Sequence, residues 1–146
     1  MMLNFDAAER HTCIVKRQKT STPLQALVTL NDPQFVEAAR VLAQRTLVAY
    51  ISTSKTKMDM LSFPDVLIQA MFKAVLSRPA RPVEVGLLKK LYSDELLSFK
   101  NEPKRAKALL KVGEYPIEAA LKTNELAAWT LVVSTVMNMD EALVKR

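Results

Sequence analysis

The chain has 146 residues, of which 49% are hydrophobic and 25% are charged. That much apolar surface excludes intrinsic disorder as a description of the whole chain. Two glycines are few for a β-sandwich or barrel, and a single cysteine excludes a disulfide framework or a multi-cysteine metal site. The formal charge of +6 favours anionic partners without identifying one.

Neither the start of the chain nor its most apolar stretch has the pattern of a targeting or membrane-spanning segment. The first six residues lack a basic region followed by an apolar core, so they do not resemble a signal peptide. The longest apolar stretch, residues 126–139, is interrupted by polar side chains and is shorter than the roughly 20 residues that a bilayer requires. We expect a buried core helix there and no membrane span.

Residues 1–21 show no sustained periodicity and are predicted to be a lead-in segment, with a helical bundle over residues 22–146. Thr22, Pro23 and Gln25 form a capping-box pattern, which predicts a short helix through Leu30. Asp32 before Pro33 predicts an N-cap and the start of a second helix. Its apolar stripe consists of Phe35, Val36, Ala39, Leu42, Ala43, Thr46, Leu47 and Tyr50.

Residues 52–57 are predicted to form a loop, and a third helix is expected from near Pro64. The proline-rich residues 77–82 predict a rigid connector, because residues before proline avoid the helical region. A long helix from Pro82 follows, and Gly86 inside it suggests that a partner packs closely there. Its apolar face consists of Val85, Leu88, Leu91, Tyr92, Leu96 and Phe99.

Pro103 is expected to open a basic helix that runs through Lys111, with Gly113 as its C-cap. Residues 115–123 fit either a helical turn or a loop. A last helix is expected from about Asn124, with Ala128, Leu131, Val132, Thr135, Val136 and Met139 on one face. The sequence therefore predicts an all-α fold, an irregular bundle of five or six helices with Pro-rich connectors, in a single domain over residues 1–146.

Four stretches together resemble the C-terminal part of the planctomycete PSD-one domain, a domain of unknown function in large exported proteins of planctomycetes and related bacteria. They are Phe5-Asp6-Ala7 with Cys13 and Lys16-Arg17; Thr20 to Leu27 with Leu30 to Pro33; Leu76-Ser77-Arg78-Pro79 with Glu84; and Glu125 to Thr130 with Asn138-Met139-Asp140-Glu141.

The resemblance implies that the chain is the C-terminal fragment of a larger domain, with further domains upstream of it. Proteins of this kind often carry a cytochrome c-like haem module, so haem is implied for upstream domains and no cofactor for this chain. The location implied is export to the periplasm or cell surface, whereas the chain as written would stay in the cytoplasm. Arg81 departs from the family pattern, which has a capping threonine there, and we expect a cost of about 1 kcal/mol.

The candidate binding site is a basic cluster beside the first predicted helix. Ammonium, guanidinium and hydroxyl groups next to a helix N-terminus can hold phosphate, sulfate or a carboxylate. A solvated basic loop with an ordinary capping threonine explains the same pattern. The residues of this candidate anion site are Lys16, Arg17, Lys19, Thr20 and Thr22.

No catalytic or metal site is predicted. His11 and Cys13 could meet on one side of an extended segment, but no oxyanion-hole pattern accompanies them. Adding Asp6 and Glu9 gives four metal ligands whose spacing matches no zinc pattern. Trp129 is expected to be a core or inter-domain anchor, and Arg78 is expected to lock its connector by bonding helix C-terminal carbonyls.

These features favour a non-catalytic helical module for structure or interaction, whose partners are upstream domains of a parent protein or a second copy. Such a module should expose an apolar patch where its partner belongs. The alternative is a small basic protein that binds an anionic polymer, either nucleic acid or an acidic polysaccharide. An enzyme is less favoured for this chain alone.

Overall fold

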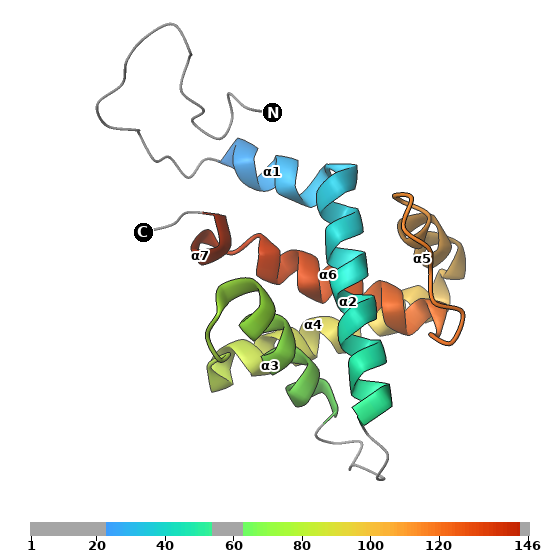
Figure 1. Cartoon of the computed structure of the whole chain (residues 1–146). Coiled ribbons are helices and arrows are strands. Elements are labelled where there is room, and N and C mark those ends of the chain that lie inside the picture. The colour runs from blue at the N-terminus through green and yellow to red at the C-terminus, as the bar shows by residue number, and fades with distance from the viewer. Residues whose placement is uncertain (1–22, 54–62, 144–146) are drawn as a thin grey trace, which may run out of the picture.

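Helix α6 (Thr123–Met137) runs through the middle of the molecule, with the other helices placed around it (Figure 1). The structure is a computed structural model that describes residues 23–53 and 63–143. Within these ranges α6 contacts every other helix, and no strand is present. The other helices are α1 (Pro23–Asn31), α2 (Pro33–Thr53), α3 (Phe63–Leu76), α4 (Pro82–Asn101), α5 (Pro103–Leu110) and the single turn α7 (Asp140–Leu143).

The prediction of an all-α bundle is confirmed. The described residues form seven helices where five or six were expected, and the difference includes the short α7. Residues 111–122 form an irregular loop, which settles the ambiguity over 115–123. The lead-in segment and most of the predicted 52–57 loop lie outside the described residues, so the domain boundaries stay predictions.

Proline and aspartate set the helix starts where the sequence predicted them. Asp32 Oδ1 accepts the backbone N–H of Gln34 at 2.9 Å, as an N-cap should. Pro33, Pro82 and Pro103 each occupy the first position of a helix, where the missing N–H costs nothing. These starts divide the chain into helices short enough to be arranged around α6.

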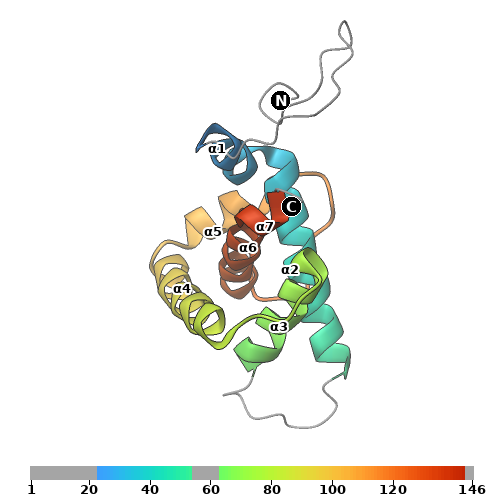
Figure 2. The same cartoon turned by 90° about the vertical axis from the view of Figure 1, so that its left-hand side faces the viewer.

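The core lies around α6, which is buried on nearly all sides (Figure 2). Trp129 has no exposed surface, so its predicted role as an anchor in the core is confirmed. Its ring stacks on Tyr92 from α4 at 4.3 Å between centroids and meets the edge of Phe63 from α3 at 6.4 Å. The predicted single apolar face of this helix was too narrow, because Ala127 and Val133 are buried as well, whereas Thr135 is exposed.

None of the helices in the described ranges is both long and apolar enough to cross a bilayer.

The expectation that a partner packs closely at Gly86 is wrong. Gly86 is exposed on α4, and a Cβ built there would meet no atom within 4 Å. Glycine loses more backbone entropy on folding than alanine does, and here no closely packed neighbour compensates for that loss.

Replacing Gly86 with alanine should raise the free energy of unfolding by about 0.5–1 kcal/mol, because alanine has the better helix propensity and the site has room. Urea unfolding followed by the fluorescence of Trp129 measures this change. A destabilised Gly86→Ala variant would show that something does approach this face of α4.

Candidate functional site

The predicted anion site cannot be located in the structure. Lys16, Arg17, Lys19, Thr20 and Thr22 all lie outside the described residues. The same is true of His11, Cys13, Asp6 and Glu9. The anion-binding cluster therefore stays a prediction.

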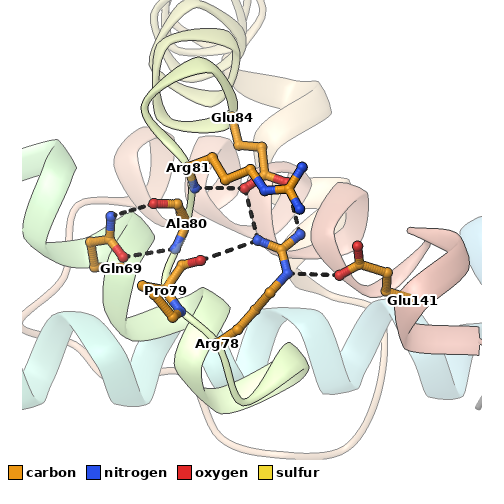
Figure 3. A network of polar contacts seen from close by, with 7 residues as sticks. All are labelled: Gln69, Arg78, Pro79, Ala80, Arg81, Glu84 and Glu141. Carbon is orange, nitrogen blue, oxygen red and sulfur yellow. Dashed lines mark hydrogen bonds and ion pairs between the residues drawn. The ribbon is translucent and has the colours of Figure 1, made fainter.

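The main polar cluster is centred on Arg78, in the connector between α3 and α4 (Figure 3). Its Nη1 and Nη2 donate to the two carboxylate oxygens of Glu84 at 2.9 and 2.8 Å. Its Nε donates to Glu141 Oε2 at 2.7 Å, which ties α7 to the connector. Such a two-pronged pairing is the geometry for which a guanidinium is suited and an ammonium is not. We call Arg78, Glu84 and Glu141 the arginine node.

Arg78 locks its connector, as predicted, but by a different set of acceptors. Within the described residues it reaches no carbonyl of the C-terminal turn of α3; besides the two carboxylates it bonds the Pro79 carbonyl at 3.1 Å. The preceding residue, Ser77, has a φ of 57°, which turns the chain sharply at the end of α3. The guanidinium also lies 5.3 Å from the centre of the Phe72 ring, so it covers an edge of the core.

Glu84 accepts one of the backbone N–H groups at the start of α4. The arginine side chain has no acceptor, yet the Arg81 backbone N–H donates to Glu84 Oε2 at 2.7 Å. This bond is one half of a capping box. A capping threonine would accept an N–H further into the first turn of α4, and the Arg81 side chain makes no such bond, so the expected cost of losing the threonine stays a prediction.

The ionisation of Glu84 follows from these donors. Its hydrogen bond with Arg78, and then the Arg81 N–H, lower its pKa from 4.5 to about 2. The same pairing with Glu84 and Glu141 raises the pKa of Arg78. A general acid or base needs a pKa near the working pH. Glu84 is thus held as a permanent anion, which suits an ion pair between helices.

Gln69 completes the fixing of the connector. Its side-chain oxygen accepts the Ala80 N–H at 2.8 Å, and its nitrogen donates to the Ala80 carbonyl at 3.0 Å. The amide therefore imitates a strand partner for one residue of the connector, and it holds that residue against α3 (Figure 3).

Two of the stretches that carry the family resemblance, Leu76 to Pro79 and Asn138 to Glu141, meet at one end of the bundle. The node joins Leu76-Ser77-Arg78-Pro79 to Glu141, 63 residues from Arg78. Nearby, the Thr29 hydroxyl of α1 lies within hydrogen-bond distance of Asn138 Oδ1, in the turn before α7. Residues far apart in the sequence therefore act together as joints between α1, the connector and α7.

A second polar cluster, which was not predicted from the sequence, lies on α2 under the loop 111–122. Glu37 Oε1 accepts the backbone N–H groups of Glu114 and Tyr115 at 2.7 and 2.6 Å. Gly113 precedes them with a φ of 90°, and a Cβ there would collide with the side chain of Glu37. The prediction of Gly113 as the C-cap of α5 is wrong, because Lys111 occupies that position. The glycine lies two residues further on and lets the loop approach Glu37.

Arg40 in this cluster is only 1% exposed. Its Nη2 donates to the Tyr115 carbonyl at 2.8 Å, and Gln44 Nε2 donates to the Pro116 carbonyl at 3.3 Å. The sequence pattern that indicates this burial is helical spacing: Arg40 and Gln44 directly follow the buried Ala39 and Ala43, one turn apart on α2. What the periodicity could not supply was the distant loop that provides the acceptors.

The described ranges contain no group of three or more His, Cys, Asp or Glu side chains placed to hold a metal ion. The carboxylates of both clusters accept backbone or guanidinium donors instead.

The described part of the chain is an all-α bundle. Its two polar clusters, around Arg78 and around Glu37 and Arg40, join segments that are distant in the sequence. The model of the PSD1 family, described as proteins of unknown function (DUF1553), matches residues 1–92. The chain belongs to this family. No curated protein and no solved structure matches the chain.

The Glu84 ion pair should make stability depend on pH. Because the pKa of Glu84 is lowered in the folded state, its contribution is complete above pH 4.5 and is lost as the pH falls towards 2. At pH 7, Glu84→Gln should lower the free energy of unfolding by about 1–3 kcal/mol. The difference between the two proteins, measured by urea unfolding from pH 7 to pH 2, should shrink at the acid end.

Glu141→Gln is the matched control for this experiment, because Glu141 is 53% exposed and makes one bond to the same guanidinium. It should cost less than about 1 kcal/mol. A Glu84→Gln difference that stays constant down to pH 2 would contradict the lowered pKa.

Gly113→Ala should lower the free energy of unfolding by about 1–3 kcal/mol, because the positive φ and the contact with Glu37 both oppose a side chain. Gly86→Ala is the natural comparison, since it makes the same chemical change at an open helical site. If both glycine variants were equally stable, the loop would not be held against Glu37 as described.

Proposed function

We propose that this chain is a non-catalytic interaction module that packs against neighbouring domains of a larger PSD1 protein, and that α1 is its docking surface. The observation that carries this proposal is the reversed polarity of α1. This helix buries Gln25 and Thr29, which are 4% and 5% exposed, and turns three leucines outward.

The outward face of α1 consists of Leu24, Leu27 and Leu30, which are 52%, 57% and 45% exposed. A surface helix normally places its apolar stripe towards the core. Fully burying a leucine contributes about 1.5–3 kcal/mol, so covering the exposed half of each contributes about 1 kcal/mol. Three leucines on one short helix are therefore a favourable contact for an apolar partner surface.

The roles of the motif residues support a module without its own chemistry. Asp32 caps a helix, Arg78 and Glu84 form an ion pair, and Asn138 lies against Thr29. Side chains engaged in this way position helices and leave no free base or nucleophile among themselves. In this chain these residues build the scaffold on which α1 is presented.

The alternative function, binding of an anionic polymer, stays a prediction. The cluster from Lys16 to Thr22 that would serve it most directly lies outside the described residues.

Photo-crosslinking in the source cells tests the docking surface. A photo-reactive amino acid in place of Leu27 should crosslink to a peptide outside the 146 residues of this chain, identified by mass spectrometry. The control is the same substitution at Leu97, which is 62% exposed on α4 and should give little product.

Crosslinks from position 27 that stay within residues 1–146 would overturn the proposal, because the leucine face would then be covered by the chain itself. Equal crosslinking from positions 27 and 97 would overturn it as well, since it would show contact without a preferred surface.

A further inference from the structure

Two hollows adjoin at the N-terminal end of α6, far from the arginine node. The first, of about 470 Å³, is lined by Lys100 of α4, Lys107 of α5 and Lys122 before α6. Leu96 and the first residues of α6 complete its wall. We call it the basic hollow. Its volume falls within the range of small-molecule sites, about 300–1,000 Å³.

The second hollow, of about 280 Å³, has a mainly aliphatic and aromatic lining, and we call it the apolar hollow. Ile51 from the end of α2, Phe63 from the start of α3 and Leu121 from the loop before α6 contribute to it. Lys122 and Glu125 line both hollows, so the two share one wall.

The charges in the basic hollow do not balance. Lys122 Nζ pairs with Glu125 Oε1 at 2.9 Å, and this bond raises the pKa of Lys122. Lys100 and Lys107 have no carboxylate partner among the described residues. Among the described residues, two ammonium groups from different helices therefore line one hollow without a carboxylate partner, and an anion there would be attracted to both.

We propose that the two hollows together bind one single-chain amphiphile with an anionic head, such as a fatty acid carboxylate. The head lies between Lys100 and Lys107, and the acyl chain passes the Lys122–Glu125 wall into the apolar hollow. Charge complementarity fixes the sign of the head, and the adjoining apolar lining distinguishes this ligand from a simple inorganic anion. This site is independent of the α1 docking surface.

Octanoate is the probe, titrated into the isotope-labelled full chain and followed by NMR. The amide signals of Leu121, Thr123 and Glu125 should shift and saturate together. Inorganic phosphate and acetate, which lack the acyl chain, should bind at least about ten-fold more weakly. If either bound as tightly as octanoate, the apolar hollow would contribute nothing and the proposal would be overturned.

Variants separate the head from the tail. Lys100→Gln with Lys107→Gln should weaken octanoate binding about ten-fold. Lys104→Gln with Lys111→Gln removes the same charge from exposed positions outside the lining and should leave the affinity unchanged. An equal loss in both double variants would reveal a general charge effect and contradict a defined site.

The tail is tested by Ile51→Ser, which changes an exposed side chain of the apolar hollow without touching the core. It should weaken octanoate several-fold, whereas Val48→Ser, one turn earlier and outside the lining, should not. Unchanged binding in Ile51→Ser would place the acyl chain elsewhere and overturn the proposal.

Discussion

The burial of α6 is the constraint on which the rest of this structure depends. A helix that is apolar on nearly every side has to be enclosed by the chain before and after it, and α2, α4 and α5 provide most of the enclosure. Trp129 at its centre fixes how closely α3 and α4 can approach, because Phe63 and Tyr92 pack against its ring. The polar clusters then hold the outer helices in place around this core.

Both polar clusters have the same role: they hold non-helical segments of the chain against the helices of the core. The arginine node holds the connector 77–81 and α7, whereas Glu37 and Arg40 hold the loop 111–122. Each uses charged side chains as partners for backbone groups that no helix satisfies. The charges of both clusters are therefore part of the architecture.

Much of the helical plan could be predicted from local patterns. Asp32 and the prolines at positions 33, 82 and 103 mark helix starts through effects that act within one turn. Trp129 was predicted to be in the core because its neighbours are apolar. The periodicity of α6 predicted a single face, but a helix buried all round satisfies that pattern as well.

The candidate site was less predictable because its partners are distant in the sequence. Nothing near Arg78 indicates that Glu141 will accept its Nε, and nothing near Arg40 indicates the loop carbonyl at Tyr115. The open surroundings of Gly86 and the close contact at Gly113 depend equally on tertiary packing. Likewise, the sequence of α1 does not indicate which of its faces is buried. In the structure Gln25 and Thr29 are buried, so the leucines face outward.

The central claim is that a bundle built around α6 presents α1 to a neighbouring domain of the same polypeptide. The most direct test is the mass of the native polypeptide, detected in source cells with an antibody against residues 63–143. The account predicts a band much larger than the 16.4 kDa of this chain. A band at 16.4 kDa would contradict it, because no neighbouring domain would then exist for α1 to contact.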